Sequence, residues 1–208
     1  GEPARGRRRL AEVRRVTSEL LREFARKAFH MLSLVYLVFF RLVGWPAAGA
    51  WLAGWLLVCF IVETVRLKVP GVERALNGFF AGLMRDSERK HFSGIVHTTT
   101  GCLLAMLIGG GDVVIVTAAI LQLAFADAAA ALAGKAWGRT RILGGKKTLE
   151  GCLAGFAAGL ACALAAGVPP GAAAVSALAV SFVELLPTTG WFNDNLTIPV
   201  AGATVQGL

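Results

Sequence analysis

Long apolar runs constrain the fold of this chain more than any other feature of its sequence. Of its 208 residues, 56% are hydrophobic and 16% are charged, against roughly 45–50% and about 25% in soluble domains. The apolar residues form seven blocks, at 28–43, 47–65, 94–108, 113–133, 152–168, 172–186 and 196–208. A helix needs about 20 apolar residues to cross a bilayer, and in lipid its backbone groups must pair with one another. The sequence therefore predicts an all-α polytopic integral membrane bundle of about seven transmembrane helices, the last one short or tilted.

The positions of lysine and arginine predict how this bundle lies in the membrane. All but one of the 21 basic residues precede the first run, or lie between the second and third or the fourth and fifth runs. If seven helices alternate across the bilayer, these three segments lie on one side. The remaining cation, Arg41, lies near the outer end of the first run, where its head group can reach the interface. The positive-inside rule then predicts a cytoplasmic N-terminus and cytoplasmic basic loops.

The net charge of +8 needs no nucleic acid to explain it, because topology and attraction to anionic lipid account for it. Residues 1–27 carry a longer basic region than a signal peptide has, and no small-residue cleavage site follows. Their apolar residues fall roughly on one helical face, which predicts a helix lying on the membrane surface. A disordered basic tail is the alternative for the first eight residues. We expect this N-terminal segment to lead into a transmembrane catalytic domain at 28–208.

An acidic residue inside the fourth run is the first indication of chemistry. Asp127 is followed by five basic residues, the last of which is Lys147, and then by Thr148-Leu149-Glu150-Gly151. A carboxylate inside an apolar span is costly and is by default a functional group, although it can also serve as a structural hydrogen-bond partner. Cations beside it indicate an anionic partner, most simply a phosphate group. This stretch therefore predicts phosphate chemistry at a membrane surface.

Further acids lie two runs later. Glu184 is near the end of the sixth run, and Asp194 and Asn195 directly precede the seventh, at the start of the last predicted helix. Carboxylate and amide oxygens suit Mg²⁺, which typically takes one or two carboxylates together with substrate phosphates. Asp127 and Asp194 would then hold a metal against a nucleotide. For Glu184, an interhelical hydrogen bond is the alternative interpretation.

A phosphate loop of the common type is excluded. The glycine expected six residues before Lys146 is Thr140, and no strand precedes it. Lys147 and Thr148 nevertheless lie at a helix N-terminus, where backbone N–H groups favour phosphate. His30 follows Lys27 on one helical face and is either a phosphate ligand or a structural residue. For His97 a structural role is the better interpretation, and the glycines of the fifth run predict close helix packing.

These motifs resemble the polyprenol kinase group, which contains dolichol kinase, phytol kinase and CTP-dependent diacylglycerol kinase. The resemblance rests on Asp127 with the Gly134 and Gly138 pair, the 147–151 motif, Glu184, and Asp194-Asn195-Leu196-Thr197-Ile198-Pro199, with an Arg-Lys-x-x-His pattern ending at His30. The 127–151 stretch is also similar to CDP-diacylglycerol synthase. The Lys-Arg and His-Gly-Gly elements of that enzyme are absent here, so the kinase group is preferred.

The resemblance implies a Mg²⁺-dependent kinase that transfers phosphate from CTP to a membrane lipid alcohol, such as a polyprenol or phytol, and releases CDP. Its catalytic residues would be Asp127, Glu184 and Lys147, with Glu184 as general base or a residue behind the metal. Asp127 and Asp194 would hold Mg²⁺, with Asn195 orienting Asp194 or the metal. Nucleotide phosphates would contact Lys27, His30, Arg139, Lys146, Lys147, Thr148 and Glu150. The alternatives are a phosphatidate cytidylyltransferase that releases pyrophosphate, and a transporter or scaffold without chemistry. The motifs select no particular lipid and no oligomeric state.

Overall fold

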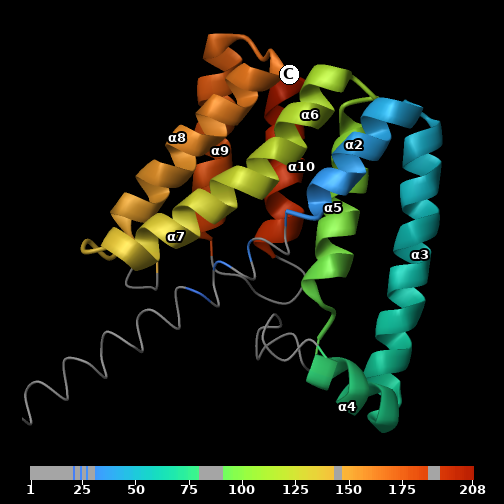
Figure 1. Ribbon diagram of the computed structural model, residues 1–208. Helices are drawn as coiled ribbons and strands as arrows, with labels where there is room; N and C mark the ends of the chain where they lie inside the picture. Colours follow the sequence, from blue (N-terminus) through green and yellow to red (C-terminus); the bar gives the residue numbers. More distant parts are fainter. Residues whose placement is uncertain are drawn as a thin grey trace, which may run out of the picture.

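The computed structural model is a bundle of helices (Figure 1). It describes residues 21, 24, 27, 31–79, 91–142, 147–186 and 193–208. Within these residues the only β-structure is an isolated antiparallel bridge between Arg141 and Thr148. The helices are α2 (Ser33–Val43), α3 (Ala47–Lys68), α4 (Pro70–Phe79), α5 (Gly94–Ile108), α6 (Val113–Leu121), η2 (Gln122–Ala126), α7 (Asp127–Trp137), α8 (Leu149–Ala166), α9 (Pro170–Leu185) and α10 (Asp194–Gln206). The all-α prediction is confirmed.

Each predicted apolar run contains a helix, although the first is described only from residue 31. Among the described residues, three helical stretches are long and apolar enough to cross a membrane: α3, the continuous helix Val113–Trp137 formed by α6, η2 and α7, and α8. Helices α2, α5 and α9 are apolar but shorter. These helices support a multi-pass membrane protein, while the number of seven spans stays a prediction. Helix α4, which follows α3 directly, was not among the predicted elements.

The helix Val113–Trp137 is the centre of the bundle. In its most apolar stretch 61% of the residues are buried, against 28% in α3 and 22% in α8. Helices α3 and α8 therefore turn most of their apolar surface outward, as helices facing lipid do. Figure 1 shows the central helix crossing between α8 and α9 on one side and α2 and α5 on the other.

Small residues bring α7 and α8 together, as the glycines of the fifth run predict. A Cβ atom on Gly151 would lie 2.7 Å from the carbonyl oxygen of Ala130, and one on Gly155 would lie 3.0 Å from Ala130 Cβ. The same close approach joins α5 to α10, where a Cβ on Gly101 would lie 2.6 Å from the carbonyl oxygen of Asn195. Without side chains at these positions the backbones approach closely, which is how helices associate in lipid.

The ends of four helices meet at one end of the bundle. Figure 1 shows the end of α7, the start of α8, the end of α9 and the start of α10 at the lower end, with the chain's C-terminus at the opposite end. The connections between α2 and α3, α5 and α6, and α8 and α9 also lie at the upper end. The motifs predicted to carry chemistry therefore lie at one end of the bundle. The assignment of that end to the cytoplasm rests on the lysine and arginine distribution alone. Apart from Leu21, Phe24 and Lys27, the predicted surface helix at 1–27 lies outside the described residues.

Candidate active site

Asp127 is placed by a local change in helix geometry. It is the first residue of α7, directly after the π-helical segment η2, and it is buried, with 3% of its surface exposed. A π-helical turn is wider than an α-helical one and shifts the following residues around the helix axis, which is frequent at functional sites. In this protein Ala126, Asp127 and Ala130 come to line one pocket.

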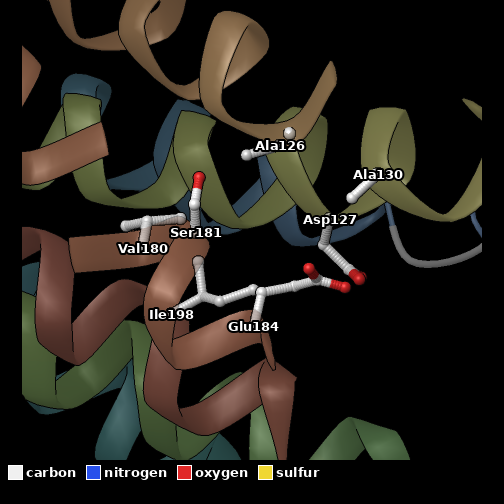
Figure 2. A pocket seen from close by; sticks show the side chains of 8 residues that line it. Ala126, Asp127, Ala130, Val180, Ser181, Glu184 and Ile198 are labelled. Carbon is white, nitrogen blue, oxygen red and sulfur yellow. The ribbon is translucent and has the colours of Figure 1, made fainter. Parts of the chain in front are cut away.

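Glu184 faces Asp127 across this pocket. It lies in the last turn of α9 and is 6% exposed. Figure 2 shows the two carboxylates pointing toward one another from α7 and α9. The rest of the lining is small or apolar except for one serine; it consists of Ala126, Ala130, Gly155, Val180, Ser181 and Ile198. Two acids that are 57 positions apart thus share one pocket.

Lys147 connects the two parts of the site that the sequence predicts. Its ammonium group forms an ion pair with Glu184 Oε1 and lies 3.6 Å from Asp194 Oδ2. Burial lowers the pKa of Lys147, but the carboxylates of Asp194, Glu184 and Asp127 outweigh burial and raise it. Lys147 is therefore a fixed positive charge among three carboxylates from α7, α9 and α10.

The second cation at the site is Lys27, whose ammonium group pairs with Asp127 Oδ2. Both side chains are buried, so this ion pair offsets part of the cost of burying the two charges. The sequence analysis predicts that Lys27 contacts nucleotide phosphates, which stays a prediction. The structure shows in addition its ion pair with Asp127. Among the described residues, three carboxylates thus face two lysine ammonium groups at this site. His30, four residues after Arg26 in the predicted pattern, lies outside them.

Thr148 and Glu150 shape the loop that presents Lys147. Thr148 is the N-cap of α8, and its Oγ1 accepts a hydrogen bond from the backbone of Gly151 at 3.2 Å. It also packs against Gly134 and Gly138, where a Cβ atom would collide with it. Glu150 accepts two bonds from the backbone N–H of Thr140, at 3.1 and 3.3 Å.

The backbone closes the same loop, since Leu149 donates to the carbonyl of Thr140 at 2.9 Å and Ile142 donates to that of Lys147 at 3.1 Å. Thr148, Glu150 and the glycines around them are therefore structural parts of a tight turn. The predicted contacts of Thr148 and Glu150 with nucleotide phosphates stay predictions. Arg139 is exposed on this loop, and Lys146 lies outside the described residues.

Asp194 is held at the start of α10 by a cap that the sequence analysis missed. Asn193 accepts a hydrogen bond from the backbone of Asn195 at 3.0 Å, and Thr197 Oγ1 donates to the Asn193 carbonyl at 3.1 Å. Asn is among the preferred N-cap residues, so its place before an apolar run could have predicted this role. Asp194 is 5% exposed and lies in the first turn, with Asn195 beside it.

A second buried charge cluster lies away from the pocket and was also missed. Arg66, 1% exposed, donates to both carboxylate oxygens of Glu63, at 3.1 and 2.7 Å, and to the carbonyl of His91 at 2.7 Å. Glu63 also accepts from the backbone of Ser93 at 2.9 Å. The cluster joins the end of α3 to the chain that leads into α5. Spacing of three residues between Glu63 and Arg66 could have predicted the pair.

His97 belongs to the same region. Its ring is buried and its Nδ1 lies 3.0 Å from the carbonyl oxygen of Ser93 one turn earlier. This contact supports the structural interpretation of His97.

The oxygen donors at the site fit a divalent cation that arrives with a nucleotide. Among the described residues, no group of three or more His, Cys, Asp or Glu side chains is arranged to hold a metal ion by itself. Mg²⁺ is commonly bound by one or two carboxylates with substrate phosphates and water completing its shell. Asp127 and Asp194 are donors of this kind, and the charges of both carboxylates raise the pKa of Lys147.

Comparison with known proteins finds one informative relative. The chain is 25% identical, over 161 residues, to a CTP-dependent diacylglycerol kinase 1 of Schizosaccharomyces pombe, and the match covers 69% of this chain and 72% of the relative. No family model matches the chain. No solved structure matches it either. The resemblance to the CTP-dependent lipid kinases that the sequence predicts is thereby confirmed, at the level of a distant relationship.

Proposed function

We propose that this protein is a CTP-dependent lipid kinase that transfers the γ-phosphoryl group of CTP to the hydroxyl group of a membrane lipid alcohol and releases CDP. The distant relationship to a CTP-dependent diacylglycerol kinase supports the reaction class. The observation that carries the assignment to a site is the convergence of three buried carboxylates on Lys147, at one end of an apolar bundle. Buried charges in a membrane protein are retained where they have a function.

Lys147 is the first group that we assign to the nucleotide. Its raised pKa keeps the ammonium group charged at neutral pH, and it precedes the N-terminus of α8, whose backbone N–H groups favour phosphate. Lys27, which pairs with Asp127, and the exposed Arg139 add positive charge, and Lys146 precedes Lys147 in the sequence. When a triphosphate binds, phosphate oxygens can replace the carboxylates as partners of these lysines.

Asp127 and Asp194, with Asn195 beside them, would hold Mg²⁺. When bound, Mg²⁺ supplies charge that stabilises the oxygens of the transferring phosphoryl group. Lys27 and Lys147 pair with these acids in the structure, which supports their ability to hold a cation.

Glu184 is our candidate for the general base. Its carboxylate lies in the pocket wall opposite Asp127, and the ion pair with Lys147 holds it in place. It would accept the proton of the lipid hydroxyl as that oxygen forms a bond to the γ-phosphorus. The bond between the γ-phosphorus and the bridging oxygen breaks, and CDP leaves with the electron pair.

The reaction is tested with purified protein in lipid nanodiscs, CTP, Mg²⁺ and a lipid alcohol. We expect CDP and a phosphorylated lipid in equal amounts. Pyrophosphate and a cytidylylated lipid would instead support the cytidylyltransferase, and the absence of any nucleotide turnover would support a transporter or scaffold. Because the positive-inside rule assigns the basic segment 135–147, which contains Lys147, to the cytoplasm, we also propose that the nucleotide enters from the cytoplasm.

A further inference from the structure

A buried hydrogen-bond network joins the central helix to three of its neighbours. Gln122 is fully buried, and its Nε2 donates to the carbonyl oxygen of Gly159 in α8 at 3.2 Å. Its Oε1 accepts from Ser176 Oγ in α9 at 3.1 Å and from Gln206 Nε2 in α10 at 3.0 Å. Gln206 Nε2 also donates to Ser176 Oγ at 2.7 Å, which closes a ring. One side chain of the central helix therefore binds α8, α9 and α10 at once.

The network lies deeper in the bundle than the candidate active site. Gln122 begins the π-helical segment η2, five residues before Asp127. Ser176 precedes Glu184 by eight residues in α9, which is about 12 Å along the helix. Figure 1 shows that each of the three helices that Gln122 binds begins or ends at the lower end of the bundle, where the site lies. The network can therefore fix the helices of the site without touching a substrate.

A glycine of α10 makes room for the Gln122 amide. A Cβ atom on Gly202 would lie 2.6 Å from Gln122 Oε1 and 3.6 Å from Ala119 Cα. Helix α10 thus approaches the central helix closely at the turn before η2. A side chain at position 202 would push the amide away from its partners.

The π-turn explains why the place of Gln122 matters to Asp127. A π-turn holds one residue more than an α-turn and is rare, so it needs contacts that favour it. If this segment changed to α geometry, the residues after it would rotate by about 100°, the angle of one residue in an α-helix. Asp127 would then leave the pocket. Among apolar helices the Gln122 amide has no water to bind, so a shift of the turn would cost its hydrogen bonds.

Resting on the proposed function, we infer that Gln122 is a positioning residue for catalysis. Its bonds to three helices fix the start of the π-turn, and the turn directs the Asp127 carboxylate toward Glu184, as Figure 2 shows. Gln122 then acts on the reaction through Asp127 and the cation that Asp127 would hold. The alternative is a network that only stabilises packing, whose loss would leave the kinetics of the folded protein unchanged.

The first test is kinetic and uses Gln122→Met, which keeps the length of the side chain and removes its hydrogen bonds. Activity is measured in nanodiscs with CTP and a lipid alcohol while the Mg²⁺ concentration is varied. We expect the Mg²⁺ concentration for half-maximal activity to rise about 10–100-fold, because a residue behind a metal ligand orients that ligand. The kcat per folded molecule should fall about tenfold or more.

Two further variants separate positioning from stability. Gly202→Ala displaces the Gln122 amide without removing it and should also raise the Mg²⁺ requirement. Thr99→Val is the matched control, because Thr99 is also fully buried and its Oγ1 forms a hydrogen bond with the hydroxyl group of Tyr36 at 3.0 Å, but it lies in α5. We expect Thr99→Val to lower the melting temperature and to leave the Mg²⁺ requirement unchanged.

Hydrogen–deuterium exchange gives a readout that needs no turnover. Exchange of the backbone amides of residues 122–131 should become about tenfold faster or more in Gln122→Met and Gly202→Ala, and should stay unchanged in Thr99→Val. An unchanged Mg²⁺ requirement, or unchanged exchange at η2, in Gln122→Met would overturn the positioning role and leave the kinase assignment standing. Faster exchange at η2 in a protein whose wild type consumes no CTP would overturn the kinase assignment instead.

Discussion

Two buried charge clusters in the described part of the chain differ in the charges that they combine. In the cluster of Glu63 and Arg66, two oppositely charged groups bind each other twice, and both also bind backbone groups. At the pocket, three carboxylates share two lysines, and the shared lysine lies 3.6 Å from Asp194. The first arrangement is one ion pair fixed to the backbone, and it links two segments of the chain. The second brings acids and lysines from several helix ends together beside a pocket, and this placement distinguishes a candidate active site from a structural cluster.

The largest expected effect is on activity at the pocket. Asp127→Asn should reduce CDP release by at least about a hundredfold, because the variant loses the charge that would hold a cation against phosphate. Asp112→Asn is the matched control, since Asp112 caps α6 with its side chain and asparagine caps equally well. Nucleotide turnover is measured for both at equal amounts of folded protein. Full activity of Asp127→Asn would show that Asp127 is not part of the active site.

At the cluster of Glu63 and Arg66 the expected effect is on stability. Arg66→Leu leaves the buried Glu63 without its partner and should destabilise the protein by about 3–5 kcal/mol. Replacing both residues by leucine should recover much of that loss, because no buried charge remains. Thermal unfolding in detergent measures the difference, and turnover per folded molecule should change little. Wild-type stability together with a loss of activity in Arg66→Leu would instead indicate that this cluster has a functional role.

A third prediction concerns the helix packing on which the pocket depends. Gly151→Ala should destabilise the protein by about 1–3 kcal/mol, because the new Cβ would lie 2.7 Å from the carbonyl oxygen of Ala130 and 3.1 Å from Gly134 Cα. Gly54→Ala, in a helix with open space around the same atom, should be neutral or stabilising. The two melting temperatures provide the comparison. Equal shifts in both variants would contradict close packing between α7 and α8.

The smallest expected effect concerns the charge of Lys147. Its folded-state pKa is raised above 10.5, so the ammonium group and the stability it contributes are fully present below pH 10.5 and are lost only as pH rises through the higher value. The KM for CTP should therefore show no titration of Lys147 between pH 7 and 9. In Lys147→His the KM should rise as pH increases past about 6.5, because neutral imidazole no longer attracts phosphate. An identical pH profile of the KM for the wild type and the variant would show that Lys147 does not bind the nucleotide.

The sequence identifies several residues of the candidate site one by one, but it does not show that they lie together. Asp127 and Glu184 stand out because each interrupts an apolar run, and the 147–151 motif stands out by its charge and glycines. The partners of these residues did not stand out. Lys27 contacts Asp127, which lies 100 positions later in the sequence. The sequence predicts Arg66 in a loop, although its side chain is among the most buried. Ser181 shares a helical face with Glu184, but nothing in its spacing predicts that its hydroxyl has no hydrogen-bond partner among the described residues.

The sequence by itself determined the class of protein, because hydrophobic length and helical period are local properties of a chain. It also determined which acids lie within apolar helices. Only the tertiary structure decided which of them meet, because that depends on the shift at η2, on the close approach of α7 and α8 through glycines, and on the cap that holds Asp194. Ion pairs between distant segments form only where packing brings the helix ends together, and no local pattern records that distance.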